Sequence, residues 1–181
     1  FDTHAHADHI SGGPALNEET GAPYYMHPYD AIHPLDMLPG TINYNYLSDG
    51  QTFSVGRFEV KVIWFPGHTL GQVNYLFTAP SGESFLFSGD GVFLNSFGRP
   101  DLGGKGEAWT PMLYDSLYER LPQHLNEDTL ILPAHFSTLD EGDENGVFTA
   151  PWGEVKAQNR SLQPRSLEEF SEYVLGNLPT F

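Results

Sequence analysis

The segment Thr3-His4-Ala5-His6-Ala7-Asp8-His9 places three imidazoles and one carboxylate in one short stretch near the start of the chain. It follows Phe1-Asp2, which we interpret as the end of a buried strand. In a helix these side chains would point in several directions, whereas an irregular loop after a strand can direct them toward one or two ions. The simplest alternative is a surface histidine cluster without a ligand role. The carboxylate of Asp8 argues against it, because the isolated His-Pro pairs elsewhere in the chain have no such companion. The remaining histidines have no evident partner and are expected at the surface: His27, His33 and His124.

Three further candidate ligands each follow directly after a predicted strand. They are His68 in Pro66-Gly67-His68-Thr69, Asp90 in Ser88-Gly89-Asp90-Gly91, and His135 in Leu132-Pro133-Ala134-His135. Ligands at successive strand ends converge on one edge of a sheet, where rigid elements can fix the geometry of a metal ion. Taken together with the first segment, these positions predict a metal-binding site.

The composition fits a folded protein that binds metal through nitrogen and oxygen atoms. A chain of 181 residues with 39% hydrophobic residues is long enough for one domain with a buried core. Cysteine is absent, so imidazole and carboxylate groups must supply the ligands. The formal net charge of -16 argues against a nucleic-acid partner and against an acidic membrane surface. No apolar run has the length of a membrane span.

Hydrophobic patterning predicts a domain that mixes helices and strands. Alternation of polar and apolar residues, or short apolar runs between turn residues, predicts strands at 57–62, 73–78, 84–87 and 129–132. Amphipathic patterns predict helices at 13–19, from Thr110-Pro111 to near Pro122, and at 166–175. Thr110 is expected to cap its helix, with Pro111 at the first helical position. Residues 26–50 are expected to form loops with short strands.

The four motifs, in this order, resemble the metallo-β-lactamase superfamily. The match covers nearly the whole chain, and the pattern His-x-His-x-Asp-His is its most specific part. The resemblance implies an α/β fold, the αββα sandwich, as a single domain over residues 1–181 with the metal site at its edge. Members normally have several strands before the first motif. We therefore expect that the N-terminal part of the fold lies outside this chain, or that another segment completes the sheet.

Two segments resemble the persulfide dioxygenase branch, also called sulfur dioxygenases: Thr3 to Gly12, and Gly98-Arg99-Pro100-Asp101-Leu102. That resemblance implies one iron(II) ion per chain, held by His4, His68 and Asp90. Two histidines and one carboxylate form the arrangement expected of a non-haem iron oxygenase. The remaining groups would surround these ligands and orient them: His6, Asp8, His9 and His135. Three of these are also expected to have catalytic roles: Asp8, His9 and His135.

Arg99 has two alternative roles. Its guanidinium could bind a carboxylate of a glutathione-like thiol, which would make it a substrate-binding residue. Alternatively it pairs with Asp101 or with a backbone carbonyl and shapes its loop, and this structural role is the one we favour.

Glyoxalase II, a thioester hydrolase of the same superfamily, resembles the metal motifs equally well but not the segment from Gly98 to Leu102. Under this alternative His4, His6 and His68 hold one zinc or iron ion, while Asp8, His9 and His135 hold a second. Asp90 bridges the two ions, which activate water against the thioester carbonyl. Since all seven positions are present, the ligand inventory does not decide the number of metal ions. A purely structural metal site is less favoured, because such sites usually saturate their metal.

The sequence therefore predicts an iron(II)-dependent dioxygenase that oxidises the outer sulfur of a low-molecular-weight persulfide, such as glutathione persulfide, to sulfite. The expected partners are that thiol persulfide and molecular oxygen, with no nucleic acid and no membrane, and a homo-oligomer is left open. The expected location is the cytoplasm, or the mitochondrial matrix if the source is eukaryotic.

Overall fold

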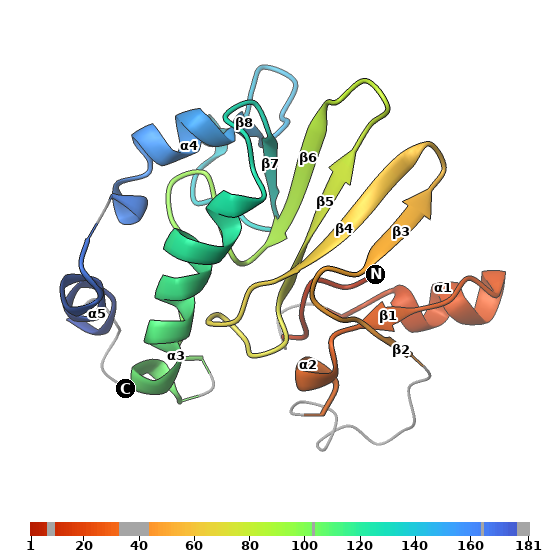
Figure 1. Ribbon diagram of the computed structural model, residues 1–181, viewed down its shortest axis with the longest axis horizontal. Coiled ribbons are helices and arrows are strands. Elements are labelled where there is room, and N and C mark those ends of the chain that lie inside the picture. Colours follow the sequence, from red (N-terminus) through yellow and green to blue (C-terminus); the bar gives the residue numbers. More distant parts are fainter. Residues whose placement is uncertain (7–9, 33–43, 103, 164, 177–181) are drawn as a thin grey trace.

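The computed structural model describes residues 1–6, 10–32, 44–102, 104–163 and 165–176. Its centre is a mixed sheet in the order β3-β4-β5-β6-β7-β8 (Figure 1). The strands are β3 (Thr52–Val55), β4 (Phe58–Trp64), β5 (Val73–Thr78), β6 (Ser84–Gly89), β7 (Leu130–Pro133) and β8 (Ala150–Pro151). Neighbouring strands are antiparallel except for the parallel pair β6 and β7. The predicted mixed α/β class is confirmed.

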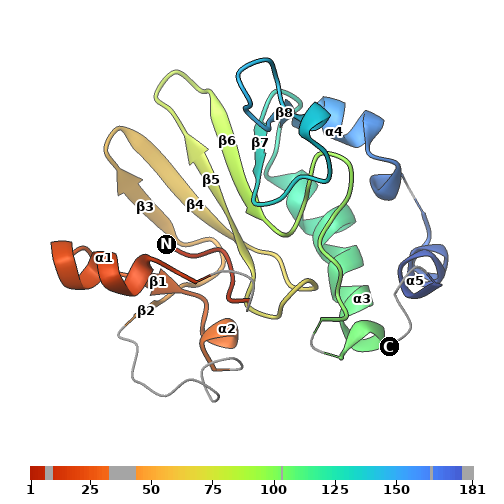
Figure 2. The ribbon, with the colours of Figure 1, turned by 180° about the vertical axis from the view of Figure 1, so that it is seen from behind.

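One face of this sheet is covered by helices from the C-terminal half of the chain (Figures 1 and 2). The helical segments there are α3 (Gly106–Tyr114), η2 (Asp115–Arg120), η3 (Leu121–Gln123), α4 (Trp152–Gln158), η5 (Arg160–Leu162) and α5 (Leu167–Gly176). Ile63 and Leu86 of the sheet pack with Leu113, Leu117 and Phe170 of the helices in one buried cluster. Burial of each such side chain contributes about 1.5–3 kcal/mol, so this layer is the main core of the fold.

The opposite face is covered by the N-terminal part of the chain at its β3 to β5 end (Figure 1). The elements there are α1 (Gly13–Thr20), β1 (Tyr25–Met26), α2 (Pro28–Ile32) and β2 (Asn45–Tyr46), and β1 pairs with β2 in parallel. The ring of Phe1 stacks on Tyr25 with its centroid 5.1 Å away and contacts Phe53 of β3. Further along this face Phe87 of β6 is 42% exposed. In the described residues the sandwich therefore consists of one large sheet, a helical layer and this small N-terminal unit.

Three local predictions need correction. Phe1 and Asp2, expected at the end of a buried strand, belong to no strand, and Phe1 is 45% exposed. The helix predicted to begin at Thr110 begins at Gly106, and Pro111 lies inside it. The hydroxyl of Thr110 donates to the carbonyl of Gly106 at 2.7 Å, so it bonds back into the helix instead of capping it. The segment 26–50 was expected to hold only loops and short strands, but it also contains α2, which is too short to show a helical period.

The topology brings three strand ends to one edge of the sheet. Because β4 and β6 are both antiparallel to β5, they run in the same direction, and β7 is parallel to β6. The loops that leave their carboxyl ends carry His68, Asp90 and His135. Gly67 has φ +142°, and a Cβ there would lie 2.5 Å from Leu113, so this turn depends on glycine. The predicted convergence of these three residues is confirmed.

The N-terminal segment reaches the same edge through hydrogen bonds to β5. The amide of Val73 donates to the carbonyl of Thr3 at 2.8 Å, and the Tyr75 hydroxyl donates to the carbonyl of Asp2 at 2.5 Å. These bonds lay residues 1–3 alongside the start of β5. His4 and His6 therefore enter the site from the side of the sheet.

Candidate metal centre

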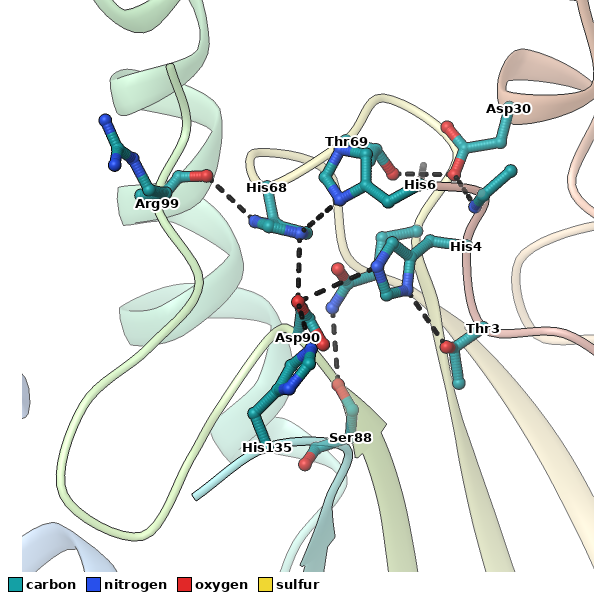
Figure 3. Close-up of polar contacts among 12 residues, drawn as sticks. Thr3, His4, His6, Asp30, His68, Thr69, Ser88, Asp90, Arg99 and His135 are labelled. Carbon is teal, nitrogen blue, oxygen red and sulfur yellow. Dashed lines mark hydrogen bonds and ion pairs between the residues drawn. The ribbon is translucent and has the colours of Figure 1, made fainter. Parts of the chain in front are cut away.

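Four side chains direct donor atoms toward a common point at this edge (Figure 3). Donor atoms of His4, His6, His68 and Asp90 all lie within 4.8 Å of one another. Nε2 of His68 is 2.9 Å from Nδ1 of His6 and 3.2 Å from Oδ2 of Asp90. Nε2 of His4 is 3.8 Å from the same carboxylate oxygen. The three residues expected to hold iron therefore lie close together, and His6 lies in the same group of donor atoms.

The tautomer of His68 indicates that this cluster suits a cation. Its Nδ1 is 2.8 Å from the carbonyl oxygen of Arg99, which only accepts hydrogen bonds, so Nδ1 carries the proton. In the neutral ring Nε2 then presents a lone pair toward the Asp90 carboxylate. The second oxygen of Asp90, Oδ1, is buried and has no hydrogen-bond partner in the described part of the chain. A metal ion would satisfy both groups, so these residues fit the metal that the motifs imply.

Asp90 is the electrostatic centre of the cluster. Burial alone would raise the pKa of its carboxyl group. In the metal-free site a protonated His68 donates to it from Nε2, and this bond and the positive charges of the imidazoles of His4, His68 and His135 hold that pKa below its usual value. The group therefore stays ionised. Nε2 of His135 lies 3.5 Å from Oδ2 of Asp90, and the His135 side chain is 38% exposed. His135 thus approaches the carboxylate from the solvent side.

The segment from Gly98 to Asp101 lies directly against the candidate ligands His68 and Asp90. A Cβ at Gly98 would lie 2.7 Å from Nδ1 of His68 and would also clash with the backbone carbonyl of Asp90. Only glycine therefore allows the loop to place the Arg99 carbonyl on His68. The guanidinium of Arg99 forms a two-bond ion pair with Asp101, with Nε 2.6 Å from Oδ1. The structure thus contains the pairing expected for the loop-shaping role of Arg99, and its substrate-binding role stays a prediction.

The structure also contains a buried carboxylate, Asp30 of α2, that sequence reasoning did not select. It is 3% exposed and contacts both ligand-bearing loops. Burial raises the pKa of Asp30, and hydrogen bonds from Thr69, Ala5 and Gly71 oppose this shift by favouring the ionised form. A single Asp after His-Pro-Tyr gives no sequence signal of this kind.

Other histidines lie away from the centre or outside the described residues. His27, expected at the surface, is buried and stacks on Trp64 with ring centroids 5.8 Å apart. His124, also expected at the surface, is partly buried with its Nδ1 3.3 Å from the Lys61 ammonium. The predicted site residues Asp8 and His9, and also His33, lie outside the described residues.

Comparison with protein families identifies the fold. Residues 3–137 match the model of the Metallo-beta-lactamase superfamily. The chain belongs to this superfamily. None of the helices in the described part of the chain has the length and apolar character needed to cross a membrane.

Curated relatives in the superfamily include two kinds of enzyme. The hydroxyacylglutathione hydrolase of Rhodospirillum rubrum is 32% identical over 168 residues, which are 93% of this chain and 57% of that protein. The mitochondrial persulfide dioxygenase ETHE1 of Homo sapiens is 33% identical over 179 residues, 97% of this chain and 60% of that protein. The chain spans somewhat more than half the length of these relatives, and their identities do not separate the two activities.

Two solved structures are similar to this chain in fold and sequence. The crystal structure of ETHE1 from Myxococcus xanthus has a TM-score of 0.73 and 29% identity, covering 98% of this chain and 68% of that one. The crystal structure of TTHA1623 in a di-iron-bound form has a TM-score of 0.60 and 29% identity, covering 87% of this chain and 74% of that one. Both similarities support a metal-binding superfamily site, and iron is bound in the second of these proteins.

Proposed function

We propose that this chain carries the active site of an iron(II)-dependent persulfide dioxygenase that converts a low-molecular-weight persulfide, such as glutathione persulfide, to sulfite. The observation that carries this proposal is the position of the Gly98-Arg99-Pro100-Asp101-Leu102 segment. This segment distinguishes the dioxygenase resemblance from the hydrolase resemblance, and its Arg99 carbonyl accepts the Nδ1 proton of the metal ligand His68. The segment is therefore part of the support of the metal centre.

In this proposal His4, His68 and Asp90 hold one iron(II) ion. When bound, iron supplies the site where oxygen and the persulfide meet and the redox chemistry of sulfur oxidation. Oxidation of the outer sulfur to sulfite transfers four electrons to one molecule of oxygen. Water supplies the third oxygen atom, the S–S bond breaks, the thiol leaves with its sulfur at the same oxidation level, and two protons are released. Atoms and electrons therefore balance without any further oxidant.

The protein groups would position and protonate the reactants. The Arg99 carbonyl fixes the ring of His68, which keeps its Nε2 directed into the site. His6 lies beside His68 and limits the space on that side. His135 contacts Asp90 and is also exposed, so it can exchange protons with water as the thiol and sulfite form.

The second candidate is a hydrolase of a glutathione thioester with two metal ions. It is favoured by one feature of the site, the inclusion of His6 in the donor set with His4 and His68. The similarity to a hydroxyacylglutathione hydrolase supports it as well. Both candidates use a thiol derivative in one site, so the reaction itself must distinguish them.

An oxygen electrode makes that distinction with the iron-loaded protein. With glutathione persulfide we expect oxygen consumption and release of sulfite. With S-lactoylglutathione under anaerobic conditions we expect little cleavage, because one iron ion lacks the partner that would help to generate and aim hydroxide. Anaerobic thioester cleavage without persulfide-dependent oxygen uptake would assign the chain to the hydrolases instead. Two tightly held metal ions per chain in elemental analysis would support the same reversal.

A further inference from the structure

We propose that Asp30 is a positioning residue of the metal centre, because its carboxylate ties the loop that carries His4 and His6 to the loop that carries His68. The inference rests on the metal-binding part of the proposed function. It holds for a dioxygenase and for a hydrolase alike.

The geometry of this tie involves both carboxylate oxygens. Figure 3 shows the contact of one of them with Thr69. Oδ2 of Asp30 accepts the amide proton of Ala5 at 3.1 Å and the hydroxyl proton of Thr69 at 2.7 Å. Oδ1 accepts the amide proton of Gly71 at 2.7 Å. Ala5 stands between His4 and His6, and Thr69 follows His68 directly. One side chain of α2 therefore joins two ligand loops that are far from it in the sequence.

The backbone at Gly71 packs closely against Asp30. A Cβ at Gly71 would lie 2.6 Å from the carboxyl carbon of Asp30, so glycine is required for the loop to approach it. A buried carboxylate is costly unless donors surround it, and this one has three. An amide in its place would turn an N–H group toward at least one of these donors. Both the negative charge and the two acceptor oxygens of Asp30 are therefore needed for these three hydrogen bonds.

The tie acts at a different point from the other bonds of the N-terminal segment. Those bonds hold residues ahead of His4: Val73 to the carbonyl of Thr3, Tyr75 to the carbonyl of Asp2, and Tyr24 to the carboxylate of Asp2. Asp30 holds the backbone between the two histidines and, through Thr69, the residue next to His68. It therefore controls where the imidazole of His6 lies relative to that of His68, whose facing nitrogens are 2.9 Å apart.

The test measures cobalt(II) binding to the intact protein, with Asp30→Asn as the first variant. We expect affinity for Co(II), measured by competition with a chelator, to fall about 10- to 100-fold, as is typical when a supporting hydrogen bond is lost. The visible absorption of bound Co(II) should change as well, since it reports the ligand geometry. The matched control is Asp2→Asn, which weakens the 2.6 Å bond from Tyr24 in the same segment. It should lower the melting temperature of the metal-free protein and leave the Co(II) spectrum as in the wild type.

Thr69 provides a second, milder pair of variants for the case that Asp30→Asn does not fold. Thr69→Val removes the hydroxyl donor and should weaken Co(II) binding several-fold, while Thr69→Ser keeps the donor and should restore wild-type affinity. Equal affinity and identical spectra in the wild type, Asp30→Asn and Thr69→Val would overturn the proposal and leave Asp30 with a structural role alone. Absence of persulfide oxidation in the wild-type protein, together with the expected order of Co(II) affinities among the variants, would contradict the proposed function and still support the role of Asp30.

Discussion

The metal centre has two halves that are built in different ways. His68, Asp90 and His135, the sheet residues of the site, each follow a strand end, and their positions are set by the hydrogen-bond ladder of β4, β6 and β7. His4 and His6, the arm residues, belong to residues 1–6 and are held by bonds to β5 and to Asp30. The first half is a consequence of topology. The second depends on a few individual side chains, so substitutions should affect the two halves differently.

The largest effect is expected for Asp90→Ala, in the sheet half. Oδ2 of Asp90 is the one atom that reaches His4, His68 and His135, so its loss removes the only negative charge of the described donor set. We expect iron affinity to fall more than about 100-fold, beyond the loss typical of a residue that only supports a ligand. His4→Ala, in the arm half, should cost less. Elemental analysis after anaerobic iron loading and gel filtration measures both, and an equal loss would show that the halves contribute alike.

A smaller effect is expected for Gly98→Ala, which tests the loop that supports the sheet half. The added methyl group would meet Nδ1 of His68 and the carbonyl of Asp90, so the loop must move. We expect a destabilisation of about 1–3 kcal/mol in chemical denaturation of the metal-free protein, and weaker Co(II) binding. Gly12→Ala is the matched control, because a Cβ there has nothing within 4 Å and the change should stay within about 0.5 kcal/mol. Indistinguishable unfolding of the two variants would contradict the close packing of this loop.

Arg99→Ala and Asp101→Asn separate the two roles considered for Arg99. If the guanidinium only shapes the loop through its ion pair, both variants should behave alike, and their double variant should be no worse than either. We expect this result, with a stability loss of at most about 1 kcal/mol, because the Arg99 side chain is partly exposed. A rise in KM for the persulfide in Arg99→Ala alone, at unchanged Co(II) affinity, would instead assign Arg99 to substrate binding.

The same division explains how much of the site could be predicted from the sequence. His68 and Asp90 stand at the ends of strands whose pattern is local, so their convergence follows from strand direction. His135 follows for the same reason. The arm half is different, because Asp30 interacts with backbone groups 25 and 41 residues away that carry no sequence signal. Its helix, α2, is also too short to be recognised by periodicity.

Errors elsewhere have similar tertiary causes. Thr110-Pro111 has the local pattern of a helix start, yet the helix begins earlier and includes it, since its buried residues Trp109, Thr110 and Leu113 pack against the core. His27 was expected at the surface because nothing near it in the sequence could cover its ring. The indole of Trp64 does so from β4. Local chemistry thus predicted the elements and most ligands, whereas contacts between distant segments decided burial and support.

The smallest effect is expected for Thr3→Val, in the arm half. Oγ1 of Thr3 lies 3.1 Å from Nδ1 of His4, and when Nε2 of His4 binds a metal ion, Nδ1–H donates to this hydroxyl. Valine keeps the shape of threonine and removes only the acceptor. The backbone of His4 should therefore stay in position, while its ring is no longer held in one orientation. We expect Co(II) affinity to fall at the weak end of the range for such supports, about 10-fold or less, with Thr3→Ser close to the wild type. Chelator competition on the three proteins measures this order. A loss as large as that of Asp30→Asn would mean that the contact of Thr3 with the His4 ring positions the arm residues as much as the bond from Asp30 to the Ala5 backbone does. The two halves of the site would then not differ in the way described above.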